Sequence, residues 1–407
     1  MGISKKVRNA IFIGVLCSVS YLAVYFARNI LSAVTPQMIE KGVLTTEFGG
    51  TLSSMFFTFY AVGQLINGVI GDKIKAKYMI CGGLLLSGVA NIIFTHCIME
   101  RTVATVAYAM VGFFLSMIYG PMTKVVAENT EPVYATRCSL GYTFSSFFGS
   151  PLAGVFAAIL AWDSVANIGS AALIIMAMVC FGFFLVFEKK GIVKYNQYKA
   201  EKSGSKNIKV LIEYKIIKFS LISIITGVVR TAVIFWLPTY ISQYLGYSSE
   251  KAAAVFTIAT FIISFTTFIA VFVYERLKNN MDLTLIIMFS VALVGFALVY
   301  FVRMPVMNII FMVIAVMGSN GAAAMIWSRY CPSLRDTGMV STATGFLDFL
   351  SYMAAAVSSS LFANAVEGIG WKNLILVWLG LMVIGFITVL PHKAILAKLK
   401  KENATAA

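Results

Sequence analysis

The chain has 407 residues, of which 59% are hydrophobic and only 12% are charged. Soluble domains carry about 25% charged residues, so this composition excludes an ordinary soluble protein and indicates an integral membrane protein. A net charge of +15 would suggest nucleic-acid binding in a soluble chain. In a membrane protein the places where the cations fall decide what the charge means.

Twelve apolar segments follow one another, and each is long enough to cross a hydrocarbon core of about 30 Å as a helix. The predicted spans are residues 9–36, 49–71, 78–98, 102–124, 138–161, 164–187, 216–245, 251–275, 281–302, 304–328, 338–366 and 370–391. The first has no cleavage pattern and is expected to stay as a helix. Gly120–Pro121 and Gly149–Pro151 predict breaks in the fourth and fifth helices.

Lysine and arginine sort sharply between the two sides of this topology. Of the 32 cations, 25 fall on the side that holds both termini and the central loop, and five on the other. Cytoplasmic loops carry the excess of such residues, so both termini are expected in the cytoplasm, with the protein in a bacterial inner membrane. The two cations left over, Arg28 and Arg230, lie inside predicted spans.

Two landmarks repeat along the chain at nearly one spacing. Arg28 precedes Pro36 by eight residues and Arg230 precedes Pro238 by eight, an offset of 202 between the pairs. The GDKIK and YERLK stretches that end the second and eighth spans are offset by 203. A repeated offset indicates a duplicated unit. The expected organisation is a six-helix bundle over 1–188, a basic cytoplasmic linker over 189–215, a second six-helix bundle over 216–391, and a cytoplasmic tail over 392–407.

Two parallel six-helix repeats are the architecture of major facilitator transporters, which hold substrate between the halves near the midplane. The fold class is therefore an all-α membrane protein with twelve transmembrane helices in two pseudo-symmetric bundles. The GVIGDKIKAK stretch also resembles that superfamily's loop motif. The residues expected to serve gating and loop packing are Gly68, Asp72, Lys73 and Lys75, with Glu275 and Arg276 in the second half.

The buried arginines need a physical reason, because arginine in hydrocarbon costs from roughly 3 to above 10 kcal/mol. One interpretation is structural pairing, for which Asp348 is the one acid well inside a span. The other is that both arginines clamp an oxyanion, since guanidinium stays charged and matches phosphate oxygens bidentately. Phosphate, sulfate and carboxylate all fit at this point. Asp348 is either a coupling acid or the partner in an ion pair.

Tyrosines accompany these positions. Tyr21 and Tyr25 precede Arg28 by seven and three residues, which places them on roughly the same helix face, and Tyr60 lies in the second span. We expect them to line the same site. No nucleophile–base pair, metal-ligand spacing or phosphate-binding glycine loop is evident, so neither an enzyme nor a cofactor or metal site is expected.

Three stretches resemble the organophosphate:phosphate antiporter family: YLAVYFARNILSAVTP, VVRTAVIFWLPTY, and TGFLDFLSYM followed by GWKNLILVW. Members of this family exchange sugar phosphates or glycerol phosphate for inorganic phosphate. The resemblance implies that Arg28 and Arg230 bind the phosphoryl group. It also implies that four tyrosines line the pathway: Tyr21, Tyr25, Tyr60 and Tyr352.

The chain departs from that family at three places. Asn29 and Gln64 stand where family members often carry lysines, and Ser145, Ser146 and Phe147 lie where a helix 5 histidine is usual. Fewer cations suggest a less charged ligand or different contacts.

The expected function is transport of organic phosphate esters in exchange for phosphate by alternating access. The alternatives are H⁺- or Na⁺-coupled transport of a carboxylate or sugar acid, and a non-transporting phosphate-ester sensor. The expected partners are a small anion and the lipid bilayer, without nucleic acid, and the protein is expected to act as a monomer.

Overall fold

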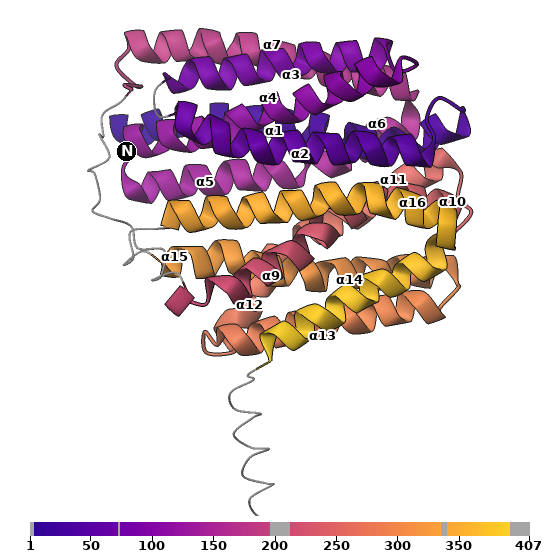
Figure 1. Ribbon diagram of the computed structural model, residues 1–407. Helices are drawn as coiled ribbons and strands as arrows, with labels where there is room; N and C mark the ends of the chain where they lie inside the picture. The colour runs from indigo at the N-terminus through magenta and orange to yellow at the C-terminus, as the bar shows by residue number, and fades with distance from the viewer. Residues whose placement is uncertain (1–3, 72–73, 196–211, 335–339, 391–407) are drawn as a thin grey trace, which may run out of the picture.

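The computed structural model describes residues 4–71, 74–195, 212–334 and 340–390, and within these ranges the secondary structure is entirely helical (Figure 1). The helices before the central gap are α1 (Lys5–Glu40), α2 (Thr46–Gly71), α3 (Ala76–His96), α4 (Arg101–Asn129), α5 (Pro132–Phe147), α6 (Gly149–Ile159) and α7 (Trp162–Lys189). Those after it are α9 (Ile216–Gly227), the π-helix η1 (Val228–Val233), α10 (Ile234–Gln243), α11 (Ser249–Ser264), α12 (Thr266–Arg276), α13 (Met281–Phe301), α14 (Pro305–Met325), the π-helix η2 (Ile326–Tyr330), α15 (Cys331–Ser333) and α16 (Val340–Val389).

Nine helical stretches of the described chain are long and apolar enough to cross a membrane. One of them is α16, which Gly370 divides into two helices, since its backbone there has φ 76° and ψ 165°. That conformation suits glycine because a side chain would be strained at positive φ. Three further helical stretches bring these nine to the twelve predicted spans. They are α2, the pair α5–α6, and the part of α16 that follows Gly370.

The two predicted helix breaks have different outcomes. The fifth span does break, because α5 and α6 meet at Phe148. The fourth does not: α4 runs through Pro121 without interruption, so that prediction was wrong. Membrane helices tolerate proline where hydroxyls and neighbouring helices satisfy the freed backbone groups. Pro121 has no amide to bond the carbonyl four residues earlier, that of Met117, and α4 continues past this point.

The helices pack as two groups that touch along a seam. Figure 1 shows α1 to α7 together in one part of the molecule and α9 to α16 in the other. Across the seam α2 lies along α16, α6 along α11, and α1 along α10. The central gap falls between the two groups, but the exact domain boundaries stay a prediction. Here "the linker end" is the end of the bundle that holds residues 4, 74–75, 190–195 and 212–215, and "the far end" holds 41–45 and 244–248.

Two glycines set how closely the helices approach near the middle of the bundle. A Cβ on Gly227 would lie 2.5 to 2.7 Å from three atoms of Ser351, two of them backbone atoms. A Cβ on Gly149 would clash in the same way with the backbone of Tyr25. Real Cβ atoms do not come this close to fixed backbone. Glycine therefore allows α9 to pack on α16, and α6 on α1, at the depth of the buried arginines.

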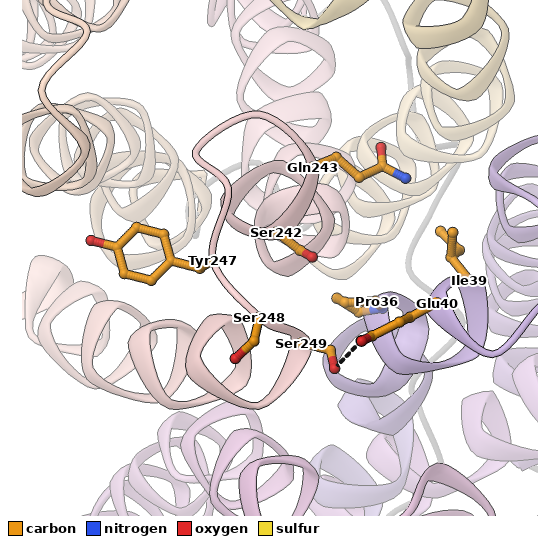
Figure 2. A pocket seen from close by; sticks show the side chains of 8 residues that line it. All are labelled: Pro36, Ile39, Glu40, Ser242, Gln243, Tyr247, Ser248 and Ser249. Atoms are coloured by element: carbon orange, nitrogen blue, oxygen red, sulfur yellow. Dashed lines mark hydrogen bonds between the residues drawn. The ribbon is translucent and has the colours of Figure 1, made fainter.

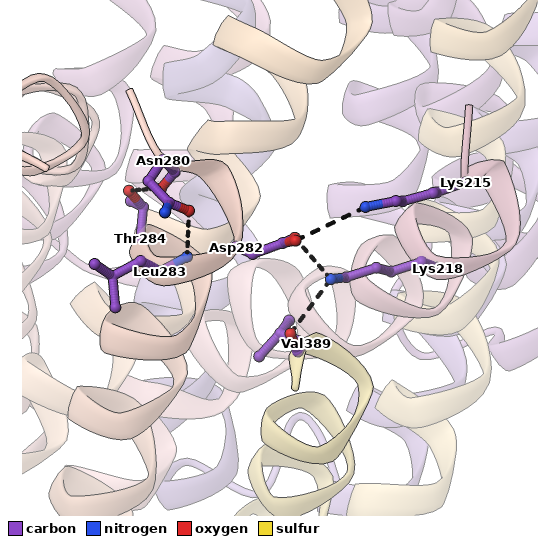
Figure 3. Close-up of polar contacts among 7 residues, drawn as sticks. All are labelled: Lys215, Lys218, Asn280, Asp282, Leu283, Thr284 and Val389. Atoms are coloured by element: carbon purple, nitrogen blue, oxygen red, sulfur yellow. Dashed lines mark hydrogen bonds and ion pairs between the residues drawn. The ribbon is translucent and has the colours of Figure 1, made fainter. Parts of the chain in front are cut away.

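Charged side chains tie helix ends together at the linker end of the second group (Figure 3). The Lys218 ammonium donates to Asp282 at 2.9 Å and to the Val389 carbonyl at 3.3 Å, and Lys215 lies 3.8 Å from the same carboxylate. Asn280 caps α13 by accepting from the Leu283 amide at 3.0 Å. The network holds the starts of α9 and α13 against the end of α16.

In the first group, a single ion pair joins α3 to α7. Lys77 is only 6% exposed at its side chain, and its ammonium lies 2.5 Å from the Glu188 carboxylate. A buried charge is tolerated only when it is paired, and removing one partner leaves the other uncompensated. The pair therefore fixes the relative position of these two helices.

The hydrogen bonds between the two groups are concentrated toward the far end. Ser32 donates to the Phe235 carbonyl at 2.6 Å, and Ser249 donates to Glu40 at 2.5 Å. Further bonds across the seam pair Arg28 with Tyr352, Ser53 with Ser359, Thr257 with Pro151, and Ser264 with Phe147. Hydrogen bonds therefore hold the two groups together from the depth of the arginines to the far end.

Candidate functional site

Helix α1 presents one polar stripe to the second group. Tyr21, Tyr25, Arg28 and Ser32 recur every three or four residues, which places them on one helix face. Ser32 is bonded to the backbone of α10 across the seam. Arg28, one turn before it, therefore also faces the second group.

Aromatic rings surround the Arg28 guanidinium. Its central carbon lies 4.8 Å from the centroid of the Tyr60 ring, 5.3 Å from that of Tyr25 and 5.6 Å from that of Phe57. Cation–π attraction contributes about 0.5 to 2 kcal/mol per ring, depending on how far the pair is desolvated. The rings help to hold the charge inside the membrane without neutralising it.

Arg230 lies in the π-helical segment η1, which follows the close approach of Gly227 to α16. Its Nη2 donates to the Ser351 hydroxyl at 3.2 Å and lies 3.8 Å from the Asp348 carboxylate. Its guanidinium carbon is 5.8 Å from the centroid of the Trp327 ring, and Trp327 belongs to the other π-helix, η2. Single π-helical turns often mark functional sites, and here two of them meet at one side chain.

Tyr352 joins the two arginines. Arg28 donates to its hydroxyl at 3.2 Å, and the guanidinium carbons of Arg28 and Arg230 lie 5.0 and 5.5 Å from its ring centroid. The arginines of the two groups therefore converge on one ring. Together with Tyr25, Phe57, Tyr60, Trp327, Asp348 and Ser351 they form what we call the arginine cluster.

The arginine cluster has more positive than negative charge. Arg230 has Asp348 within ion-pair distance, with side chains that are 29% and 30% exposed. Arg28 has no acidic partner among the described residues. Two guanidiniums against one carboxylate leave an excess positive charge in a part-exposed site at the seam, which is an arrangement that binds anions. The pure structural-pairing interpretation therefore accounts for Arg230 but not for Arg28.

The predicted site residues are brought together with one exception. Arg28, Arg230, Tyr25, Tyr60, Tyr352 and Asp348 all belong to the arginine cluster. Tyr21 is buried one ring away: its ring centroid lies 4.9 Å from that of Tyr25 and 5.5 Å from that of Tyr119. It supports Tyr25 rather than contacting an arginine.

The residues predicted for gating lie apart from the arginine cluster, at the linker end. Asp72 and Lys73 fall outside the described residues, and Gly68 lies in the last turns of α2. The Lys75 ammonium is 5.9 Å from the Tyr195 ring centroid. Burial raises the pKa of the Tyr195 phenol above its ordinary value, so this ring stays neutral beneath the lysine.

The second-half gating residues also contact neighbours at the linker end. Glu275 accepts from the Arg329 guanidinium at 3.0 Å, linking α12 to η2. Arg276 lies over the ring of Phe272 at 5.1 Å. Neither has a contact with the arginine cluster, and a role in gating or loop packing stays a prediction.

Three members of the cluster were not predicted. Phe57 precedes Tyr60 by three residues and Ser351 follows Asp348 by three, so helical periodicity around the predicted residues could have found both. Trp327 is different, because it comes from a helix that carries no other predicted site residue.

The departures from the antiporter family have a structural explanation at two positions. The Asn29 side chain donates to the Tyr25 carbonyl at 2.6 Å, and Ser145 donates to the Gly141 carbonyl at 3.0 Å. Both side chains bond their own helix. Trp236 is fully buried and donates to the Ser359 carbonyl at 3.3 Å, so it packs inside the second group.

A separate pocket of about 280 Å³ lies at the far end, between α1, α10 and the start of α11 (Figure 2). Its lining residues are Pro36, Ile39, Glu40, Ser242, Gln243, Tyr247, Ser248 and Ser249. Glu40 is the one charged side chain among them, and it is bonded to Ser249 across the seam. An acidic lining makes this pocket unsuitable for an anion, unlike the arginine cluster.

Membrane-spanning helices in two groups, with a charged site at the seam between them, define a membrane transporter rather than an enzyme. The family model of the Major Facilitator Superfamily matches residues 17–359, and the chain belongs to that superfamily. The all-helical fold predicted from sequence is confirmed.

Named relatives cover almost the whole chain at low identity. A glycerol-3-phosphate transporter of Bacillus subtilis (strain 168) is 22% identical over 392 residues, which is 89% of this chain and 86% of the relative. A phosphoglycerate transporter protein of Salmonella typhimurium is 23% identical over 387 residues, which is 86% of this chain and 82% of the relative. The predicted resemblance to phosphate-ester transporters is thereby confirmed.

Among solved structures, a bacterial homologue of the human lysosomal transporter Spinster, in an inward-facing and unoccupied conformation, has a TM-score of 0.72. It is 12% identical, and the match covers 95% of this chain and 97% of that chain. The likeness shows the shared fold.

Proposed function

We propose that this protein is a secondary active transporter that exchanges organic phosphate esters for inorganic phosphate. The observation that carries the proposal is the convergence of Arg28 and Arg230 on Tyr352 with one carboxylate between them. Relatives named for glycerol 3-phosphate and phosphoglycerate support the same ligand class.

A phosphoryl group suits this site better than a singly charged anion. Guanidinium binds phosphate oxygens through two parallel hydrogen bonds, and a dianion can accept from both arginines at once. Asp348 supplies one negative charge to Arg230 in the empty site. Phosphate supplies two, so its arrival neutralises Arg28 as well and displaces the carboxylate from Arg230.

Exchange rather than free transport follows from the charge of the empty site. Without an anion, two guanidiniums on either side of one ring repel each other by an amount on the order of 2 kcal/mol at an effective dielectric constant of about 20. Closing the two helix groups around the empty site would also remove water from both guanidiniums, which is unfavourable for a charge. A bound phosphate removes this barrier, so the groups change position with ligand and seldom without it.

The seam indicates how the site is reached. Hydrogen bonds hold the two groups together from the depth of the arginines to the far end, which supports entry of the ligand from the linker side in this state. By the distribution of lysine and arginine, that side is the cytoplasm, with both termini there, and the membrane is a bacterial inner membrane. Alternating access requires the far-end bonds to break while the linker side closes. A single chain supplies the whole site, so the monomer is sufficient.

One alternative transporter rests on Asp348. A carboxylate in contact with a buried arginine can take up a proton and couple its movement to that of a carboxylate substrate. Such a protein would accumulate a sugar acid under a pH or sodium gradient without needing phosphate inside. A sensor that binds phosphate esters without moving them is the other alternative.

The test is uptake of radiolabelled phosphate into proteoliposomes that are loaded with phosphate or left empty. We expect uptake only into loaded vesicles, and competition by phosphate esters added outside. Uptake driven by a pH gradient into empty vesicles would favour the carboxylate transporter. Binding of esters to the purified protein without exchange would favour the sensor.

A further inference from the structure

The cluster contains a polar atom that has no partner. The Trp327 indole nitrogen is buried and makes no hydrogen bond among the described residues, although its ring lies beside Arg230. An unpaired buried N–H costs about 1 to 3 kcal/mol. A residue in that state at the edge of an anion site points to a ligand that completes the bond.

A second unpartnered atom lies on the same helix. The Asn320 side-chain oxygen is also buried without a partner, and Asn320 precedes Trp327 by seven residues, so the two share one helix face. The opposite face of α14 is already packed, because Gly318 and Gly321 lie against α13. Helical periodicity therefore places Asn320 on the side of α14 from which Trp327 reaches Arg230.

We propose that Trp327 and Asn320 bind the organic part of the transported ester, and that this part carries hydroxyl groups. The inference rests on the proposed function. An indole nitrogen can only donate, and the free oxygen of Asn320 can only accept. A hydroxyl group satisfies either of them. A carboxylate would place negative charge against the Asn320 oxygen and leave it unsatisfied.

The positions also suit an extended ligand. Seven residues of helix correspond to a rise of about 10 Å, which a ligand with hydroxyls on several carbons can follow while its phosphate stays on the arginines. Trp327 contacts Arg230, so it meets the first carbons, and Asn320 lies further along. Sugar phosphates and glycerol phosphate have this pattern, whereas phosphoglycerate ends in a carboxylate.

The experiment compares competitors of phosphate exchange by wild-type protein and by Trp327→Phe in proteoliposomes. The probes are glycerol 3-phosphate, glucose 6-phosphate, 3-phosphoglycerate and methyl phosphate, which has no hydroxyl. Phenylalanine keeps a ring beside Arg230 but removes the N–H. We expect the half-inhibiting concentration of the hydroxylated esters to rise about tenfold relative to methyl phosphate, which is the loss of one hydrogen bond. Asn320→Leu should also raise the half-inhibiting concentration of glucose 6-phosphate relative to that of methyl phosphate.

Trp378→Phe is the matched control. Trp378 also has a buried, unpartnered indole nitrogen, but it packs against Phe296 and Phe362, away from the arginines. The ratio between hydroxylated esters and methyl phosphate should stay unchanged in this variant.

The outcomes separate this inference from the function on which it rests. If wild-type protein exchanges phosphate and esters compete, but the ratio is the same in Trp327→Phe and Asn320→Leu, the subsite is wrong while the function stands. A preference of the wild-type protein for 3-phosphoglycerate over glycerol 3-phosphate and glucose 6-phosphate, which have no carboxylate, would also overturn it. If wild-type protein shows no exchange, the proposed function itself fails. Direct binding measured by thermal shift replaces transport if a variant is inactive.

Discussion

Replacing Asp348 with asparagine changes the charge of the arginine cluster with little change in shape. In the empty site the carboxylate lies 3.8 Å from Arg230, and unit charges at that distance attract by about 4 kcal/mol at an effective dielectric constant of about 20. Because both side chains are about 30% exposed, we take roughly a third of this value as the energy that phosphate must replace. Asp348→Asn should therefore bind phosphate about tenfold more tightly.

The same change should slow exchange. A ligand that binds more tightly leaves more slowly, so the maximal rate of phosphate exchange should fall as the affinity rises. Without phosphate, the variant should also unfold at a lower temperature than the wild type, since Arg230 then lacks its acidic partner, and added phosphate should restore the difference. Calorimetric titration of the purified protein measures the phosphate affinity, uptake into proteoliposomes measures the exchange rate, and thermal unfolding measures the loss of stability.

Asp282→Asn is the control for this prediction. It removes a carboxylate with a comparable ion pair, to Lys218 at 2.9 Å, but at the linker end of the bundle. It should leave phosphate affinity unchanged. Weaker phosphate binding by Asp348→Asn, or loss of uptake driven by a pH gradient with affinity unaltered, would refute the competition between Asp348 and phosphate. The second result would make Asp348 a coupling acid.

Three further variants test other parts of the structure. Arg28→Lys and Arg230→Lys should each lower phosphate exchange at least a hundredfold while the protein stays folded, because lysine keeps the charge but cannot form the bidentate contact. Glu188→Gln should lower the free energy of unfolding by about 2 to 3 kcal/mol, since it leaves the buried ammonium of Lys77 with a neutral partner; thermal unfolding in detergent measures this. Gly50→Leu should abolish exchange but not folding, because a side chain there meets α16 at the far-end seam and holds it open.

Arg101→Lys serves as the control for the two arginine variants. Arg101 is exposed at the far end, where it lies over the ring of Phe48, and its replacement should leave exchange within twofold of the wild type. Near-normal exchange by either buried-arginine variant would contradict the clamp. Normal exchange by Gly50→Leu would show that the far-end seam does not need to close.

Much of the arginine cluster was predictable from the sequence. Both the energetic cost of an arginine in an apolar span and the periodicity of a helix can be recognised from residues that are close together in the chain. An arginine inside an apolar run is expensive wherever it falls, and residues three or four positions away share its face, which identified Tyr25. Trp327 was not predictable in this way. Its contact with Arg230 depends on how α14 and η2 pack against η1, almost a hundred residues earlier, and one tryptophan in a span carries no such information.

Backbone details were also beyond the sequence pattern. Pro121 predicted a break in α4 that does not occur, because hydroxyl groups and neighbouring helices can satisfy the backbone that a proline frees. The π-helix η1 had no signal at all. Arg230 and Pro238 have the same spacing as Arg28 and Pro36, yet α1 stays regular while η1 widens.

This difference between otherwise matched helices has a consequence for how a ligand is oriented. If the two halves were strict copies, an ester lying between two equivalent arginines could bind equally well in either of two directions, related by the pseudo-twofold axis. Arg230, in the wider turn of η1, lies beside Trp327 and Asp348. Arg28 has no counterpart of either among the described residues, and only tyrosine and phenylalanine rings surround it. Under the proposed exchange, one direction of binding is then preferred, and an ester with two unlike ends is expected to cross the membrane in a single orientation.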